Sequence, residues 1–347
     1  MARQKLRVAI IGAGAISQRR HLREYKLRND VEVVAIADPK PDRAKEVAKE
    51  NGIPNYFADY REALKLKVDI ASICSPTAFH ATQSIAFLKA GAHVLCEKPM
   101  ASSMKEARAM LQAAKGARRQ LMIGHNQRLH IAHRRGREIY ASGELGRCLG
   151  FRTSFAHGGP EHWSVDGLDC HFFKKVQAVW GAMADLGVHK IDLVRWLLGE
   201  DFVEAAAMCD RLDKKQCDVE DTAFAVLRTE KGAIGHMFAG WMLKAGEENS
   251  TVLYCTKGVL KLEDDPEYPV VAILPTGEKR LHKTRGIQTN AVGGQVTSGI
   301  ITAFVDAVVA GKPVPIMGSD AANSLAAVVA CVESSEKGGK FVKVDNI

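Results

Sequence analysis

Three side chains that can hold or transfer protons lie close together in the sequence: Asp185, His189 and Asp192. On an α-helix, residues three or four apart share a face, so this spacing places two carboxylates beside an imidazole. A carboxylate near a histidine can orient the ring and raise its basicity, which suits a general base near neutral pH. The surrounding residues are mostly apolar, so we expect a buried helix. A buried pair of this kind can be catalytic, part of a metal site or a structural hydrogen-bond network.

The composition excludes several classes of protein. The chain has 347 residues, of which 46% are hydrophobic and 25% charged, values typical of a globular protein with one or two domains. No apolar run approaches the ~20 residues of a membrane span. The N-terminus leads from a short basic stretch into a strand-like run, unlike a signal peptide. We therefore expect no membrane partner.

Charge and cysteine usage narrow the class further. The net charge is +8, but the basic pairs Arg19-Arg20, Arg118-Arg119 and Arg134-Arg135 are spread along helical patterns. This distribution favours solvated helix faces and no nucleic-acid partner. The eight cysteines are scattered without a CxxC pair. They predict reduced thiols, a cytoplasmic location and no metal site.

A glycine turn follows the first apolar run. Residues 6–11 read as a strand and lead into Gly12-Ala13-Gly14-Ala15-Ile16-Ser17. In a dinucleotide-binding turn, the first glycine allows the tight bend and the second lets a pyrophosphate approach the backbone. The N–H groups of the following helix then point at the phosphates. Ser17 stands where the usual fingerprint has a third glycine or an alanine, so the turn alone is a weak signal.

The end of the next predicted strand indicates which dinucleotide binds. Residues 31–37 form that strand, and Asp38 follows it. A carboxylate at this position suits the ribose hydroxyls of NAD and repels the 2′-phosphate of NADP. Lys40 and Arg43 lie nearby and keep NADP as an alternative cofactor.

Strands and helices alternate through residue 124, which predicts a doubly wound parallel sheet. The expected strands cover residues 6–11, 31–37, 68–74, 93–96 and 120–123, and expected helices cover 41–51, 80–90 and 103–117. Ligands bind at the carboxyl ends of such strands. Three polar segments fall there: Ser75-Pro76-Thr77, Glu97-Lys98-Pro99 and His125 to Arg128. A lysine at a strand end is usually a solvated charge, but Lys98 lies at the edge expected for the cofactor and could donate to a substrate oxygen.

From residue 125 onward the pattern changes, and we expect a second α/β domain over 125–347, with a large, mostly antiparallel sheet. The expected strands cover residues 148–156, 202–209, 222–228, 233–241, 250–255, 258–262 and 270–274, and helices follow over 297–310 and 320–336. The loop from His157 to Lys175 is rich in glycine, histidine and aromatic residues. His157 and Trp163 there suit a sugar pocket, although a self-packed loop or a subunit contact explains the composition equally well.

The chain resembles the Gfo/Idh/MocA oxidoreductases, a family that includes glucose–fructose oxidoreductase and inositol 2-dehydrogenase. The resemblance rests on the glycine turn, Ser75-Pro76-Thr77 with His80, Glu97-Lys98-Pro99 and residues 181–192, and it covers nearly the whole chain. It implies a Rossmann domain over residues 1–124, a homodimer or homotetramer formed through the second sheet, and a cis Lys98–Pro99 bond. Trp180 stands where many relatives have glycine, which would narrow the pocket.

The resemblance also implies roles for individual residues. Lys98, Asp185 and His189 would form the catalytic group. The expected cofactor contacts are Gly12, Gly14, Ala15, Ile16, Asp38, Ser75, Pro76, Thr77, His80, Glu97, Lys98 and Gln127. The expected substrate contacts are Lys98, Arg128, His157, Trp163, Asp185 and His189. The segment around Gln127 and Arg128 departs from the family's common pattern at His125 and Leu129.

These residues predict reversible hydride transfer between NAD and a secondary hydroxyl of a sugar, inositol or related polyol. His189 would take the hydroxyl proton, Asp185 would orient His189 or bind a neighbouring hydroxyl, and Lys98 would stabilise the oxyanion. Two alternatives stay open. One is an enzyme that cleaves glycosides through transient oxidation by tightly held NAD, and the other is a regulator that binds dinucleotide without catalysis.

Overall fold

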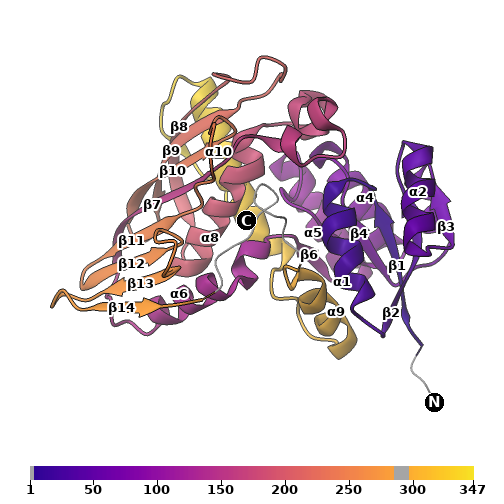
Figure 1. Cartoon of the computed structure of the whole chain (residues 1–347), viewed down its shortest axis with the longest axis horizontal. Coiled ribbons are helices and arrows are strands. Elements are labelled where there is room, and N and C mark those ends of the chain that lie inside the picture. Colours follow the sequence, from indigo (N-terminus) through magenta and orange to yellow (C-terminus); the bar gives the residue numbers. More distant parts are fainter. Residues whose placement is uncertain (1–3, 285–296) are drawn as a thin grey trace.

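Two β-sheets from different parts of the chain stand side by side, each with its own layer of helices (Figure 1). The computed structural model describes residues 4–284 and 297–347. Among the helices of these ranges, none is both long and apolar enough to cross a lipid bilayer.

The first sheet is parallel and has six strands in the order β3-β2-β1-β4-β5-β6. The strands are β1 (Leu6–Ile11), β2 (Val31–Ala37), β3 (Asn55–Phe57), β4 (Ile70–Ile73), β5 (His93–Cys96) and β6 (Leu121–Ile123). The central strands are continuous apolar runs because helices cover both faces of the sheet. The predicted doubly wound sheet is confirmed, and β3 is an additional edge strand that the sequence analysis did not predict.

Helices connect these strands; the one predicted over 80–90 begins at Thr77, and the short helix over 60–64 was not predicted. They are the π-helical turn η1 (Ser17–His21), α1 (Leu22–Lys26), α2 (Pro41–Asn51), α3 (Tyr60–Leu64), α4 (Thr77–Lys89) and α5 (Met104–Ala117). Helix α2 has the predicted limits because Pro41 occupies its first turn and Gly52 ends it in the left-handed region, with φ of 67°. The strand order reverses beside β1, so the turns after β1 and β4 diverge and leave a crevice at the carboxyl edge.

The second sheet has nine strands in the order β14-β13-β12-β11-β7-β10-β9-β8-β15. The strands are β7 (Cys148–Ala156), β8 (Phe202–Asp210), β9 (Thr222–Thr229), β10 (Ile234–Gly240), β11 (Thr251–Cys255), β12 (Gly258–Leu262), β13 (Val270–Ile273), β14 (Lys279–His282) and β15 (Val342–Lys343). All pairings are antiparallel except that of β7 with β10. The predicted, mostly antiparallel sheet is therefore confirmed.

Within residues 4–284 and 297–347, helices cover only one face of the second sheet. The elements after β6 are η2 (Asn126–Leu129), α6 (Ile131–Ala141), η3 (Pro160–His162), η4 (Gly167–Asp169), η5 (His171–Phe173), α7 (Lys175–Ala178), the π-helical turn η6 (Met183–Gly187), α8 (Val188–Leu198), α9 (Ile300–Ala310) and α10 (Gly318–Glu336). Helices α8 and α10 share one apolar core with the inner face of the sheet. The opposite face carries exposed apolar side chains, namely Met208, Phe224, Val226, Ile234 and Tyr254.

The C-terminal part of the chain joins the two lobes. Ile301 and Phe304 of α9 pack with Val8 and Ile10 of the first sheet. Helix α10 contributes its first half, through Leu325, to the core of the first lobe and its second half to the core of the second lobe. A division at residue 124 therefore separates the two sheets but leaves α9 on the first lobe.

Candidate active site

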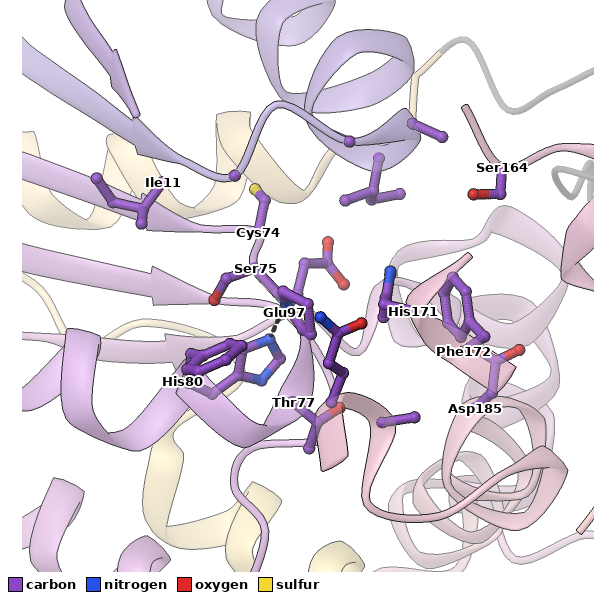
Figure 2. Close-up of a pocket in the computed structure, with 18 of the residues that line it drawn as sticks. Ile11, Cys74, Ser75, Thr77, His80, Glu97, Ser164, His171, Phe172 and Asp185 are labelled. Carbon is purple, nitrogen blue, oxygen red and sulfur yellow. Dashed lines mark hydrogen bonds between the residues drawn. The ribbon is translucent and has the colours of Figure 1, made fainter. Parts of the chain in front are cut away.

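A cavity of about 900 Å³ lies between the two lobes, at the carboxyl edge of the first sheet. Figure 2 shows Ser75, His80 and Glu97 of the first lobe facing His171, Phe172 and Asp185 of the second. The cavity lining includes Lys98, Asp185 and His189. The three predicted catalytic residues therefore meet in one place, although 87 residues separate Lys98 from Asp185.

The glycine turn is shaped to admit a dinucleotide. Gly12 has φ of 100°, and a Cβ atom there would lie 2.6 Å from the carbonyl oxygen of Cys74. At Gly14, by contrast, a Cβ atom would meet no described heavy atom within 4 Å beyond its chain neighbours. The Ser17 hydroxyl donates to the Gly14 carbonyl oxygen over 2.8 Å and fixes the turn from within. Gly12, Gly14, Ala15 and Ile16 all line the cavity, and the open space at Gly14 fits a pyrophosphate.

Asp38 lies at the end of β2, as predicted, and lines the cavity. Its Oδ2 accepts from the backbone N–H of Ala13 at 2.8 Å, and its Oδ1 accepts from that of Lys40 at 2.9 Å. The carboxylate is thus held rigidly beside the glycine turn. Each oxygen keeps acceptor capacity for a ribose hydroxyl, since a carboxylate oxygen can accept more than one hydrogen bond.

His80 holds two turns of the site in place. Its ring nitrogens lie 2.8 Å from the carbonyl oxygens of Ser75 and Pro99. Burial lowers the pKa of His80, and the two carbonyl groups oppose this shift. His80 lines the cavity, but both of its ring nitrogens bind backbone carbonyl groups. Its geometry is therefore that of a residue that positions the Ser75 and Pro99 turns. The Lys98–Pro99 bond that follows Glu97 is cis, as predicted.

Glu97 anchors the Glu97-Lys98-Pro99 segment to η1, the π-helical turn that follows the glycine turn. Its Oε1 lies 2.9 Å from Nε2 of His21, and both side chains are buried. Burial alone would raise the pKa of Glu97, but the hydrogen bond and charge of His21, with the charge of Arg20, lower it to about 2. Gly124 permits this arrangement, because a Cβ atom there would lie 3.0 Å from the Glu97 carboxylate.

Lys98 and Asp185 form the central ion pair of the cavity. The Lys98 Nζ donates to Oδ1 of Asp185 at 2.7 Å and to its backbone carbonyl oxygen at 2.9 Å. The indole N–H of the buried Trp241 donates to Oδ2 over 3.2 Å. An ammonium has three donors, so one N–H of Lys98 is left for a ligand. The predicted Asp185–His189 pairing is not the arrangement found. The Asp185 carboxylate accepts hydrogen bonds from Lys98 and Trp241 instead.

His189 enters the cavity from the start of α8, directly after the π-helical turn η6. Its ring packs 5.8 Å from that of Phe155, centroid to centroid. Its Nδ1 is buried and has no hydrogen-bond partner in the described ranges. Burial, and then the charge of Lys98, lower the pKa of His189 well below its usual value. The ring is therefore neutral at pH 7 and able to accept a proton.

Arg128 lies elsewhere than the sequence suggested. It is 3% exposed and does not line the cavity. Its guanidinium binds Asp192 through Nε at 2.7 Å and Nη2 at 2.5 Å, and it also binds Asp320. Burial would raise the pKa of Asp192, but the charge of Arg128 lowers it to about 2. Arg128 therefore ties η2, α8 and α10 together, whereas Asn126 and Gln127 of the same turn reach the cavity.

Models of one protein family match both lobes of the chain. Residues 6–125 match the Gfo/Idh/MocA oxidoreductase family, described by its NAD-binding Rossmann fold, and residues 133–261 match that family's C-terminal domain. The 1,5-anhydro-D-fructose reductase of Ensifer adhaerens is 31% identical over 230 residues, 66% of this chain and 67% of that protein. The chain belongs to the Gfo/Idh/MocA oxidoreductase family.

Two further comparisons extend over more of the chain. The myo-inositol 2-dehydrogenase of Thermotoga maritima is 27% identical over 279 residues, 79% of this chain and 80% of that protein. The structure of a levoglucosan dehydrogenase in complex with NADH superposes with a TM-score of 0.86 and covers 99% of this chain and 100% of its own, at 24% identity. This likeness shows that the oxidoreductase shares the fold of that enzyme.

The loop between β7 and α7 forms the wall of the cavity on the side of the second lobe. His157 and Trp163 both line the cavity, as predicted, and so do His171, Phe172 and Trp180. The Trp163 ring packs 5.1 Å from Phe172, and its buried N–H has no acceptor among the described residues. Burial lowers the pKa of His171 to about 4. The composition of the loop left a sugar pocket and a self-packed loop or subunit contact equally open, and the positions of His157 and Trp163 in the cavity lining favour the pocket.

Outside the cavity of this oxidoreductase, His130, His133 and Glu263 place potential metal-ligand atoms within 4.8 Å of one another. Lys190 is fully buried, and burial lowers its pKa to about 7 against the opposing charge of Glu263. Nδ1 of His130 lies 3.5 Å from Oε1 of Glu263, and the positive charge of Lys190 acts on the same carboxylate. These contacts explain the cluster without a metal cation, so it supports no metal assignment.

Proposed function

We propose that this oxidoreductase transfers a hydride between NAD and a secondary hydroxyl-bearing carbon of a sugar, inositol or related polyol. The observation that carries the proposal is the group formed by Lys98, Asp185 and His189 in the cavity beside the glycine turn. Its relatives include a myo-inositol 2-dehydrogenase and a 1,5-anhydro-D-fructose reductase, which act on molecules of this class.

The residues of the chain divide the proton chemistry between them. In the direction of oxidation, the hydroxyl proton moves to the neutral ring of His189. The remaining N–H of Lys98 donates to the substrate oxygen and stabilises its developing negative charge. Asp185 fixes the Lys98 ammonium through two hydrogen bonds and is itself fixed by Trp241. Bound along the glycine turn, NAD would accept the hydride from the carbon, so that the substrate loses one hydride and one proton.

The cavity wall supports a polyhydroxylated substrate. Aromatic rings of Trp163 and Phe172 offer faces for the C–H surfaces of a sugar. The unpartnered indole N–H of Trp163 is a buried donor, and buried donors are normally satisfied by a ligand or water. These groups suit a ring with several hydroxyls better than an aliphatic alcohol.

The test is a substrate panel with the purified protein. Inositols, aldoses and glycosides are offered with NAD, and reduced nicotinamide is followed by absorbance. The proposal predicts NADH formation with at least one polyol or sugar. Retention of NAD through purification, with turnover of a glycoside and no net NADH, would instead indicate the glycoside-cleaving alternative. Dinucleotide binding without turnover of any compound in the panel would contradict the proposal.

We propose further that a second copy of the chain covers the open face of the second sheet. Met208, Phe224, Val226 and Ile234 lie side by side there, and Phe224 stacks on Phe238 at 4.5 Å. Phe224 is 51% and Met208 74% exposed in the single chain. A contiguous apolar patch of this kind usually marks an interface. A twofold-related copy would bury it against the same patch, as expected of a homodimer or of one interface in a homotetramer.

We also infer a cytoplasmic location from the cysteines. All eight are free thiols, and six of them are buried. Free thiols persist in reducing compartments.

A further inference from the structure

The adenosine end of the cavity holds an acidic residue from the opposite lobe. Asp166 belongs to the loop between η3 and η4 and receives hydrogen bonds from Lys40 and Arg43 of the first lobe. The Lys40 Nζ lies 2.5 Å from Oδ1 of Asp166, and Arg43 reaches the same oxygen through Nη2. More than a hundred residues separate Asp166 from either cation, so this contact is a bridge between the lobes.

The bridge lies where we expect the 2′ position of the adenosine ribose of a bound dinucleotide. Lys40, Arg43 and Asp166 line the cavity together with Asp38. The Arg43 guanidinium is 3.9 Å from Oδ2 of Asp38, the carboxylate at the end of β2. In a Rossmann domain this carboxylate meets the ribose hydroxyls, and a nearby arginine is what accommodates a 2′-phosphate. The first lobe therefore carries two cations that could serve NADP.

We propose that Asp166 is a cofactor-specificity residue that favours NAD over NADP by engaging Lys40 and Arg43 in place of a 2′-phosphate. This inference rests on the proposed use of a nicotinamide dinucleotide. A 2′-phosphate entering the wild-type cavity would have to displace Asp166 from both cations. It would also approach two carboxylates, Asp38 and Asp166, whose charge repels it.

The geometry explains why Asp166 can hold this position. Its backbone N–H donates to the Ser164 hydroxyl at 3.2 Å, which fixes the turn that presents the carboxylate. The side chains of Asp166 and Arg43 are each 18% exposed, whereas that of Lys40 is 61% exposed. Water screens the Lys40 pair, so the Arg43 pair is the stronger one. Arg43 is therefore the cation whose release matters most.

The experiment compares wild type with Asp166→Asn, which keeps the size of the side chain and removes its charge. Affinities for ADP-ribose and 2′-phospho-ADP-ribose are measured by calorimetry, and kcat/KM is measured with NAD and NADP. We expect the preference for NADP over NAD, and for the phosphorylated probe, to rise by about tenfold or more. Releasing a charge-assisted pair changes affinity by roughly this factor. Adding Arg43→Gln to the variant should abolish the gain, because the cation released by Asp166→Asn is then absent.

Asp345→Asn is the control for removal of a paired surface carboxylate outside the cavity. Asp345 does not line the cavity, its side chain is 70% exposed, and its carboxylate pairs with Arg108 at 3.0 Å. Removing its charge should leave the cofactor preference unchanged. An unchanged preference in Asp166→Asn, or an equal loss of affinity for both probes, would overturn the inference. The calorimetry needs no substrate, so a protein that binds the probes as expected but oxidises nothing would refute the proposed function alone.

Discussion

At the scale of single residues, the site depends on a lysine and a histidine with different environments. Lys98 is charged and paired with Asp185, whereas His189 is buried and neutral at pH 7. One residue can therefore donate to a substrate oxygen while the other accepts its proton. On this basis we propose that His189 takes the proton and that Lys98 stabilises the negative charge on the substrate oxygen.

Removing either side chain should reduce turnover without removing the cofactor. We expect His189→Ala and Lys98→Ala each to lower kcat by roughly 10²–10⁴-fold, the usual contribution of an acid–base group. Affinity for NAD should stay within a few-fold, because the glycine turn and Asp38 are untouched. Steady-state kinetics and NAD titration check this. His282→Ala, in β14 and outside the cavity, is the control and should behave as wild type.

The pH dependence follows from the same environment. Burial lowers the pKa of His189 below 6.5, so the neutral ring that accepts the proton persists at pH 7 and is lost only at lower pH. We expect kcat/KM for oxidation to be level on the acid side of neutrality and to fall only once the pH is below 6.5. An acid limb centred above pH 6.5 would contradict the assignment of His189 as the base.

Sequence alone could predict that Lys98, Asp185 and His189 belong to one site, but not which side chains they contact. Lys98, Asp185 and His189 are recognisable from strand ends, helical spacing and family resemblance. The Asp185–Lys98 pairing depends on contact between lobes, which local spacing does not encode. Arg128 shows the same limit, since its partners Asp192 and Asp320 come from distant helices.

At the scale of elements, the glycine turn has two glycines that differ in the space available for a side chain. Gly12 is closed in by the Cys74 carbonyl group and has positive φ, whereas Gly14 faces open space. We expect Gly12→Ala to lower the free energy of unfolding by at least ~1–3 kcal/mol, the usual cost of such backbone strain. Gly14→Ala should leave stability nearly unchanged and weaken NAD binding, because its methyl group enters the space that fits the pyrophosphate. Thermal melts and NAD titration of both variants separate these effects.

The ion pair between Arg128 and Asp192 should behave as a structural feature. Arg128→Ala leaves a buried carboxylate without its main counter-charge, which typically costs roughly 3–5 kcal/mol. We expect a large loss of stability in urea unfolding, with KM for the substrate little changed in the fraction that folds. Arg134→Ala, at an exposed position of the next helix, is the comparison and should change stability by less than about 0.5 kcal/mol. If Arg128→Ala had normal stability and a raised KM for the substrate, the structural role would be wrong and Arg128 would be a substrate contact.

Long periodic elements could be predicted closely, and short ones could not. Strand β2 and helix α2 have the limits that the sequence indicated, because apolar pattern, proline and glycine all agree there. Strand β3 has three residues, too few for a pattern to be visible. Strand β14 is mostly charged and exposed, as suits an edge strand, and its sequence gives no apolar alternation.

At the scale of the whole molecule, the open sheet face should decide the oligomeric state. Phe224→Asp places a charge in the centre of the exposed apolar patch, where it would be buried in a dimer. We expect the variant to be monomeric by light scattering at concentrations where wild type is dimeric or larger. Leu27→Asp, at a 74% exposed position of the first lobe, should keep the wild-type assembly. A monomeric wild type would contradict the proposal that this sheet face is an interface between two copies of the chain.

The arrangement of the two lobes could be predicted only in part. Alternation of strands and helices indicates the first sheet, and the change of pattern after residue 124 indicates the second. Helix α9 returns to the first lobe, and α10 contributes to both cores. The sequence of each helix shows an apolar face but does not show which lobe that face packs against.

Transfer of a deuterium label from substrate to cofactor gives direct evidence of hydride transfer assisted by Lys98 and His189. The substrate found in the panel is prepared with deuterium on the reacting carbon, mixed with enzyme and NAD, and the reduced nicotinamide is analysed by mass spectrometry after one turnover. We expect deuterium to appear in the NADH, at a rate that falls by roughly 10²–10⁴-fold in His189→Ala and in Lys98→Ala. NADH without deuterium, or transfer at the wild-type rate in either variant, would contradict it.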